Sequence, residues 1–178
     1  METDQKKFES IVTHVAPGKA STSLWAFGEL VMCKITSYQT GGAYSLFEVV
    51  TQPGSGPPPH VHHREDEAFY VLEGEYEFLV ESRTINAKAG SLIYVPKGNL
   101  HAHNNVAEGI GRLLVSQTPG GLYERFFEDI GEETKDRPTT PVSEDPLDME
   151  RIAKIAAEYG IEMMSPGRSH TGQGEVTG

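Results

Sequence analysis

Two histidine-bearing segments lie between Gly54 and Asn105, and they indicate the class of the fold. The first reads GSGPPPHVHHREDE (residues 54–67), and the second reads GSLIYVPKGNLHAHNN (residues 90–105). Five of the seven histidines in the chain lie inside these segments. Side chains two positions apart on an extended strand point to the same face. We therefore expect His60 and His62 to reach one ion together.

Two further residues of this stretch complete a candidate metal site. Glu67 precedes the strand-like run AFYVL (residues 68–72), and His101 follows a Pro-Lys-Gly turn and opens another short strand. Three imidazoles and a carboxylate give a mixed nitrogen and oxygen ligand set that suits a divalent metal. The sequence therefore predicts a metal-binding β-barrel.

Ten positions of the same stretch match two motifs of the cupin superfamily. The motif G-x5-H-x-H-x4-E-x6-G is filled by Gly54, His60, His62, Glu67 and Gly74. The motif G-x5-P-x-G-x2-H-x3-N is filled by Gly90, Pro96, Gly98, His101 and Asn105. This resemblance implies an all-β fold, the cupin jelly-roll barrel (double-stranded β-helix) with short C-terminal helices. It also implies that one metal lies inside the barrel, held by His60, His62, Glu67 and His101.

Most of the chain from about Trp25 to Glu128 is similar to single-domain cupins described as quercetin 2,3-dioxygenase-like. The shared segments are residues 57–67, 70–74 and 118–121, followed by the pair Phe126 and Phe127. For quercetinases the resemblance implies binding of a 3-hydroxyflavone to the metal and its deprotonation by the ligand glutamate. Insertion of O2 into the heterocycle and loss of carbon monoxide then follow. The resemblance also suggests a homodimer.

The composition excludes several classes of protein. A chain of 178 residues has room for one domain with a core, and its net charge of −11 argues against binding to nucleic acid or to anionic membrane surfaces. The single cysteine, Cys33, leaves no internal disulfide. Residues 1–10 are charged and lack the apolar region of a secretory signal, and no run approaches a membrane span. We expect a cytoplasmic protein.

The pattern along the chain predicts four parts. Residues 1–22 are expected to form a polar N-terminal arm, and residues 23–130 the barrel with its metal site. Residues 131–165 are expected to be a linker with a C-terminal helix and a short strand, and residues 166–178 a disordered tail. Within the barrel, Gly74 is expected to turn a hairpin between the strands on either side of it.

Three aromatic residues are candidates for a substrate pocket. Phe69 lies on the same strand face as Glu67 by the alternation of side chains. Phe126 and Phe127 lie in residues 122–130, where the apolar positions have helical periodicity. Two interpretations stay open for this helix: it closes the mouth of the barrel, or it packs against the barrel exterior.

Glu67 and His103 are the candidate catalytic residues. Glu67 can act as a base if it loosens from the metal. His103 shares a strand face with His101 but lies outside the motif. It either faces the cavity, as a hydrogen-bond donor or a proton-transfer group, or it packs at the barrel rim. The charged run from His63 to Asp66 reads as a solvated turn, with His63 exposed.

Three functions are compatible with this site. The first is a metal-dependent dioxygenase of the quercetin 2,3-dioxygenase type, acting with O2 on an enolisable or phenolic, flavonol-like small molecule. The second is a non-redox isomerase, lyase or hydrolase, which several charged groups in the cavity would favour. Lys88 and Lys97 are the available cations, but neither lies on a clear inward face. The third is a non-catalytic small-molecule binder. The ligand set accepts Fe, Mn, Ni, Co, Cu or Zn, so the sequence leaves the metal open.

Overall fold

Twelve strands and three helices make up the part of the chain that the computed structural model describes, residues 12–134 and 148–164. The strands are β1 (Thr22–Ala26), β2 (Glu29–Ile35), β3 (Ser45–Thr51), β4 (His60–His62), β5 (Asp66–Glu73), β6 (Glu75–Val80), β7 (Arg83–Lys88), β8 (Leu92–Val95), β9 (Leu100–Asn105), β10 (Gly111–Thr118), β11 (Glu132–Glu133) and β12 (Ile161–Met163). The helices are α1 (Ser37–Thr40), α2 (Leu122–Ile130) and α3 (Met149–Glu158). The predicted all-β jelly-roll class is confirmed.

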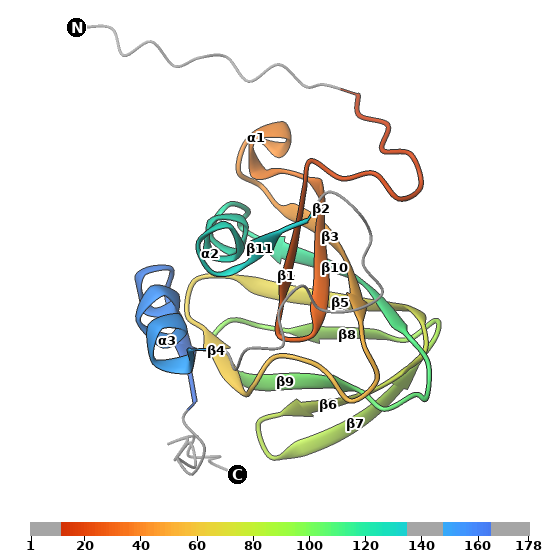
Figure 1. Ribbon diagram of the computed structural model, residues 1–178. Helices are drawn as coiled ribbons and strands as arrows, with labels where there is room; N and C mark the ends of the chain where they lie inside the picture. Colours follow the sequence, from red (N-terminus) through yellow and green to blue (C-terminus); the bar gives the residue numbers. More distant parts are fainter. Residues whose placement is uncertain (1–11, 135–147, 165–178) are drawn as a thin grey trace, which may run out of the picture.

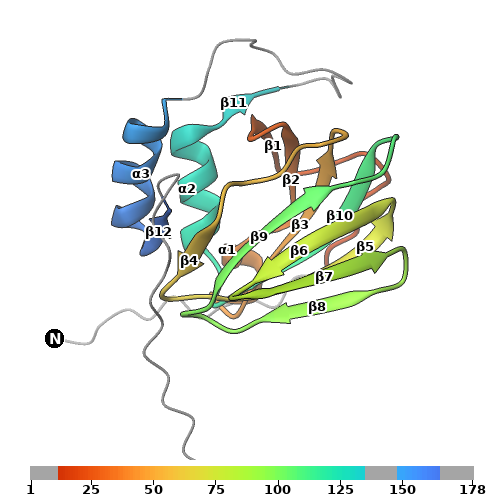
Figure 2. The ribbon, with the colours of Figure 1, turned by 90° about the horizontal axis from the view of Figure 1, so that it is seen from below.

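The strands form two antiparallel sheets that face each other (Figures 1 and 2). The larger sheet has the order β11-β1-β2-β3-β10-β5-β8, and the smaller one has the order β12-β4-β9-β6-β7. Alternate residues of each strand face inward and form a shared core that contains Phe47, Phe69, Phe78 and Leu113. Burial of such aromatic and aliphatic side chains is the main force that holds the two sheets together.

Gly74 does not turn a hairpin, and the prediction of one was wrong. The strand before it, β5, pairs with β10 and β8, whereas the strand after it, β6, pairs with β7 and β9. Gly74 has a φ of 86° and lets the chain cross from the larger sheet to the smaller one. A Cβ atom there would lie 3.0 Å from the Cα atom of Gly111. The turn signal was correct, but local sequence does not state which strands will pair.

The C-terminal elements complete the barrel at the end where the ligands lie. The strand β12 adds to the edge of the smaller sheet beside β4, which carries His60 and His62. The helix α3 lies against α2, and Ile152 and Ala156 of α3 join the core (Figure 2). Helix α3 is capped by Asp148, whose side chain accepts a hydrogen bond from the backbone of Arg151. The distant end of the chain therefore supports the strand that carries two predicted ligands.

The predicted boundaries fall partly outside the described residues. Most of the expected arm, most of the linker and the whole expected tail lie in residues 1–11, 135–147 and 165–178. Residues 132–133, at the start of the expected linker, pair with β1 as β11. No helix in the described residues has the length and apolar character needed to cross a bilayer.

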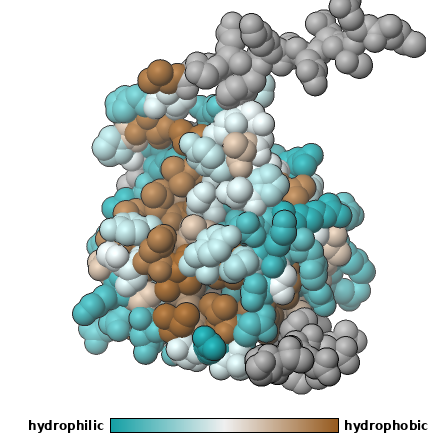
Figure 3. All heavy atoms as spheres, turned by 180° about the vertical axis from the view of Figure 1, so that it is seen from behind, coloured by the Kyte–Doolittle hydropathy of each residue, from teal (hydrophilic) through white to brown (hydrophobic). Residues whose placement is uncertain are grey.

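Apolar side chains also gather outside the core. Figure 3 shows hydrophobic residues in a band on the face seen from behind. On β5 and β8, at one edge of the larger sheet, the exposed side chains include Tyr70, Leu72, Leu92 and Tyr94. Patches of this kind on a folded domain are candidates for contact with a partner.

Candidate metal centre

Four predicted ligands from three strands meet between the two sheets. His60 and His62 come from β4, His101 from the neighbouring β9, and Glu67 from β5 of the opposite sheet. One ligand atom of each residue lies within 4.8 Å of the others, and all four residues are buried. His60 and His101 sit opposite each other in the strand register, which brings their ring centroids to 4.3 Å. The structure thus brings together the whole predicted ligand set.

Each histidine uses its Nδ1 atom for a contact with the protein. The Nδ1 of His60 donates to the carbonyl oxygen of Pro58 at 2.9 Å, and that of His101 donates to the carbonyl of Asn99 at 3.0 Å. The Nδ1 of His62 faces the carboxylate of Glu65 at 3.3 Å. These contacts fix the tautomer in which the Nε2 atom carries the lone pair, and such partners are typical of metal-binding histidines.

The ligand atoms that remain are buried without a suitable hydrogen-bond partner. The Nε2 atoms of His62 and His101 and the Oε2 atom of Glu67 have no hydrogen-bond partner among the described residues. The Oε2 of Glu67 lies 2.5 Å from the Nε2 of His101 and 3.5 Å from that of His62. Buried polar atoms without partners are costly, and one divalent cation would satisfy all of them. The residues present therefore fit a metal ion.

The electrostatics of the buried cluster shift the pKa values of its members in different directions. Burial would lower the pKa of His101, but the neighbouring carboxylate of Glu67 outweighs it and raises this pKa. Burial, followed by the neighbouring His101 and His62, holds the pKa of His60 well below its usual range. Burial alone would raise the pKa of Glu67, but the imidazoles of His62 and His101 outweigh it and hold this pKa below its usual range. A neutral imidazole and an ionised carboxylate are the forms that bind a divalent cation.

Glu67 is held by a residue that the sequence analysis did not single out. Gln117 lies opposite Glu67 in the pairing of β10 with β5, and its Nε2 atom donates to the Oε1 atom of Glu67. Gln117 is fully buried. A polar residue on the inward face of β10, next to Leu113 and Val115, was the signal that could have found it. The amide leaves Oε2 as the carboxylate oxygen directed at the histidines.

The expectation of a solvated turn at residues 63–66 was wrong for one residue. His63 is exposed as predicted, but Glu65 is only 1% exposed. Its Oε2 atom faces His62, and its Oε1 atom accepts a hydrogen bond from the backbone of Tyr123 at 3.2 Å. The first turn of α2 thus buries Glu65. This contact spans 58 residues of sequence, which is why the local charge pattern did not reveal it.

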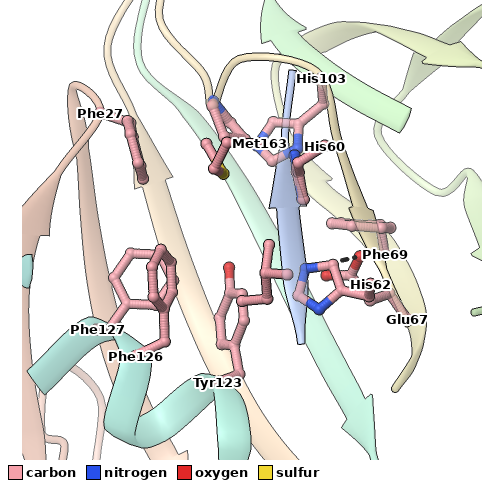
Figure 4. A pocket seen from close by; sticks show the side chains of 12 residues that line it. Phe27, His60, His62, Glu67, Phe69, His103, Tyr123, Phe126, Phe127 and Met163 are labelled. Carbon is pink, nitrogen blue, oxygen red and sulfur yellow. Dashed lines mark ion pairs between the residues drawn. The ribbon is translucent and has the colours of Figure 1, made fainter. Parts of the chain in front are cut away.

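His60, His62 and Glu67 of the cluster form one wall of a pocket whose other walls are mostly apolar (Figure 4). The pocket contains about 350 Å³ of empty space, part of it open to solvent. Its described lining includes no lysine or arginine, and Lys88 and Lys97 are exposed. The lining residues are Phe27, Pro57, His60, His62, Glu67, Phe69, His103, Tyr123, Phe126, Phe127, Ile161 and Met163. All three aromatic residues predicted for a pocket thus border it, and α2 faces the cavity.

Comparison with known proteins agrees with this geometry. Residues 47–116 match the cupin domain family, and these residues include all four ligands. The chain contains a cupin domain. A germin-like protein, subfamily T member 2, from Arabidopsis thaliana is 38% identical to it over 84 residues, which are 43% of this chain and 38% of that protein. The cupin thus spans well under half the length of this relative.

Two solved structures show the same fold. KdgF from a Halomonas species matches the cupin with a TM-score of 0.56 at 16% identity, over 62% of this chain and 96% of that chain. A predicted oxalate decarboxylase from Thermotoga maritima matches with a TM-score of 0.55 at 18% identity, over 60% of this chain and 99% of that chain. At these identities the structural likeness shows a shared fold alone.

Asn105, the last residue of the second motif, and His103, which lies outside the motif, have different surroundings. Asn105 is fully buried, and its side chain donates to the carbonyl oxygens of Thr51 and Gly109, so it acts as a structural turn residue. His103 borders the pocket but does not belong to the metal cluster. Its Nε2 atom lies 2.8 Å from the Oε1 atom of Glu29, which sequence reasoning did not single out.

Proposed function

We propose that this cupin is a metal-dependent dioxygenase of the quercetin 2,3-dioxygenase type that acts on an enolisable or phenolic small molecule. The observation that carries the proposal is the pairing of a His3Glu cluster with a pocket whose other walls are aromatic and aliphatic. A flat, mostly apolar molecule with one acidic hydroxyl matches both parts of this site. The lack of lysine and arginine in the described lining favours it over a highly charged substrate.

In this proposal His60, His62, Glu67 and His101 hold the metal. A bound divalent metal supplies Lewis-acid chemistry that lowers the pKa of a hydroxyl group and offers open positions for small ligands. Glu67 supplies the one carboxylate of the cluster, and this carboxylate would accept the hydroxyl proton once it loosens from the metal. Gln117 keeps the Oε1 atom of Glu67 in place during this transfer.

The pocket walls contribute binding and the exclusion of water. Phe69 comes from β5, and Phe126 and Phe127 come from α2, so both sides of the cavity offer aromatic surface to a planar ring. Removal of water strengthens the electrostatic contacts inside the site and limits side reactions. His103 also borders the pocket, and its catalytic role stays a prediction.

The test is O2 consumption by anaerobically purified, metal-analysed protein with a panel of flavonols. We expect O2 uptake with release of carbon monoxide, and we expect Glu67→Gln to lose it at equal metal content. Glu73→Gln, an exposed residue of the same strand, is the matched control and should retain the activity. Absence of uptake with Mn, Fe, Co, Ni and Cu would contradict the proposal and leave the non-redox enzyme and the non-catalytic binder as alternatives.

A further inference from the structure

A second buried carboxylate and imidazole meet in the barrel beside the metal cluster. His103 comes from β9 of the smaller sheet, and Glu29 comes from β2 of the larger sheet. The Nε2 atom of His103 lies 2.8 Å from the Oε1 atom of Glu29, and the two residues are 6% and 2% exposed. Neither His103 nor Glu29 is one of the four candidate metal ligands.

A chain of hydrogen bonds fixes which nitrogen of His103 carries the proton. The hydroxyl of Tyr76 donates to the Oγ1 atom of Thr51 at 3.0 Å, and this atom donates to the Oε1 atom of Glu29 at 2.9 Å. Glu29 therefore acts as an acceptor in this network. The Nε2 atom of His103 must carry a hydrogen to donate to it, and in the neutral imidazole the lone pair then lies on Nδ1.

The Nδ1 atom of His103 has no hydrogen-bond partner among the described residues, although it is buried. The imidazole sits among aromatic rings, with its centroid 5.5 Å from that of Phe69 and 5.6 Å from that of Phe78. These rings hold the imidazole in place and offer it no strong donor. His103 borders the pocket that contains the metal ligands (Figure 4). Because Nδ1 is an unpaired acceptor in a pocket with mostly apolar walls, it can select a ligand that offers one hydrogen-bond donor to it.

We propose that the Nδ1 atom of His103 accepts a hydrogen bond from a second hydroxyl group of the substrate, remote from its metal-binding oxygens. Glu29 is the positioning residue, because it holds the tautomer and the ring orientation of His103. This inference rests on the proposed function, since the ligand occupies the same pocket. It narrows the substrate class to a hydroxylated enolone or phenol with two separate oxygen functions.

The experiment compares two chelators that differ by this one hydroxyl. Kojic acid and allomaltol present the same hydroxypyranone to a metal, but allomaltol has a methyl group where kojic acid has a hydroxymethyl group. Both are titrated into the Co(II)-loaded protein under anaerobic conditions, and the change in the Co(II) absorption band gives each Kd. We expect the wild type to bind kojic acid about tenfold more tightly than allomaltol, as one well-formed hydrogen bond allows.

Four variants test the residues behind this ratio. We expect His103→Phe to bring the ratio of the two Kd values close to one while the Kd of allomaltol stays unchanged. His103→Asn keeps an acceptor near the Nδ1 position and should retain part of the preference. Glu29→Gln should reduce the ratio, because the substituted side chain no longer holds the hydrogen of His103 on Nε2. His63→Gln removes a histidine that pairs with a glutamate in the same way, at 2.9 Å from Glu162, but on the surface, and should leave the ratio unchanged.

The outcomes separate this inference from the proposed function. Equal Kd values for the two chelators in the wild type, or the same ratio in the wild type and in His103→Phe, would overturn the role of His103. Either result would leave the metal centre and the proposed dioxygenase activity untouched. Failure of both chelators to change the Co(II) spectrum of metal-analysed protein would overturn both the inference and the proposed metal chemistry.

Discussion

At the scale of single residues, two of the candidate metal ligands are oriented by contacts with buried polar side chains. Glu65 orients His62, and Gln117 orients Glu67. Neither partner belongs to the metal cluster. Partners of this kind set the direction and basicity of the ligand atoms, so their loss weakens metal binding without removing a ligand.

The first prediction concerns Gln117. We expect Gln117→Leu to lower the affinity for a divalent metal by about 10–100-fold, because Glu67 loses the donor that fixes its Oε1 atom. Competition with a chromophoric chelator measures this change. Gln52→Leu, the same substitution in the loop before β4, is the control, and an equal loss of affinity in both variants would contradict the role of Gln117.

The sequence predicts the ligands at this scale but not their partners. Fixed motif spacing identifies His60, His62, Glu67 and His101, because the residues of each motif stand at set positions along the strands. Glu29, Glu65 and Gln117 carry no such spacing. Each makes a contact with a residue far away in the chain. Glu29 contacts His103 across 74 residues, Glu65 contacts Tyr123 across 58, and Gln117 contacts Glu67 across 50. A single sequence does not contain that pairing information.

At the scale of elements, the site depends on the edge strand β12. Its residues pair with β4 in the register Ile161 with His62 and Met163 with His60. Two backbone hydrogen bonds flank this register. The N–H group of His63 donates to the carbonyl oxygen of Gly160, and that of Met164 donates to the carbonyl oxygen of Pro59. Hydrogen-bonded pairs alternate along an antiparallel ladder, so Glu162 and Val61 form the hydrogen-bonded pair between these two bonds.

The second prediction follows from that ladder. We expect Glu162→Pro to weaken metal binding, because proline lacks the backbone donor that ties β12 to the ligand strand. We also expect a loss of about 1–3 kcal/mol in the free energy of unfolding, because the buried Val61 loses the donor to its carbonyl oxygen. Metal titration and denaturant unfolding give the two values. Glu162→Ala loses the exposed contact with His63 but keeps the backbone donor, and it should change stability by about 0.5 kcal/mol or less.

The elements themselves were largely predictable, whereas their partners in the sheets were not. The periodicity of residues 122–130 predicts α2 with the observed bounds, and the short strand expected within residues 131–165 is present as β12. At Gly74 the same local reasoning predicted a hairpin where the chain changes sheets. Glycine marks a change of direction, but the choice between a hairpin and a crossover depends on the competing strands β10 and β9.

At the scale of the whole molecule, a charge network outside the barrel links three strands. Glu48 on β3 lies 2.7 Å from the Nζ atom of Lys34 on β2 and contacts Arg112 on β10. Burial alone would raise the pKa of Glu48, but hydrogen bonds from Lys34 and Arg112 outweigh it and lower this pKa. A carboxylate with a lowered pKa in the folded state stabilises the fold above its unfolded pKa, and this contribution is lost as the pH falls through the folded pKa.

The third prediction uses this sign. We expect Glu48→Gln to lower the free energy of unfolding by about 1–3 kcal/mol at pH 7, because Lys34 and Arg112 lose a charged acceptor. The difference from the wild type should shrink as the pH falls below the unfolded-state pKa of about 4.3 and through the lowered pKa of folded Glu48. Urea unfolding at several pH values measures it. A difference that does not change with pH would show that packing, not charge, explains the effect.

The fourth prediction concerns assembly, since the homodimer stays a prediction. Tyr70, Leu72, Leu92 and Tyr94 form an exposed apolar area at the β8 edge of the larger sheet. We expect Leu92→Glu, at a residue 64% exposed, to shift a dimer toward monomer in sedimentation experiments without changing metal content. Val106→Glu, at an exposed apolar residue just beyond β9, is the control and should leave the sedimentation unchanged.

The position of β12 beside the ligand strand also has a consequence for synthesis on the ribosome. His60 and His62 emerge about one hundred residues before Ile161 and Met163, the strand partners that cover their outer edge. Until those residues are synthesised, the edge of β4 that pairs with β12 lacks its partner strand. The strand pairing around the candidate ligands His60 and His62 is therefore complete only after residue 163 has been synthesised. A pause or truncation before residue 161 would leave a polypeptide that has every ligand but lacks the strand that holds two of them in place.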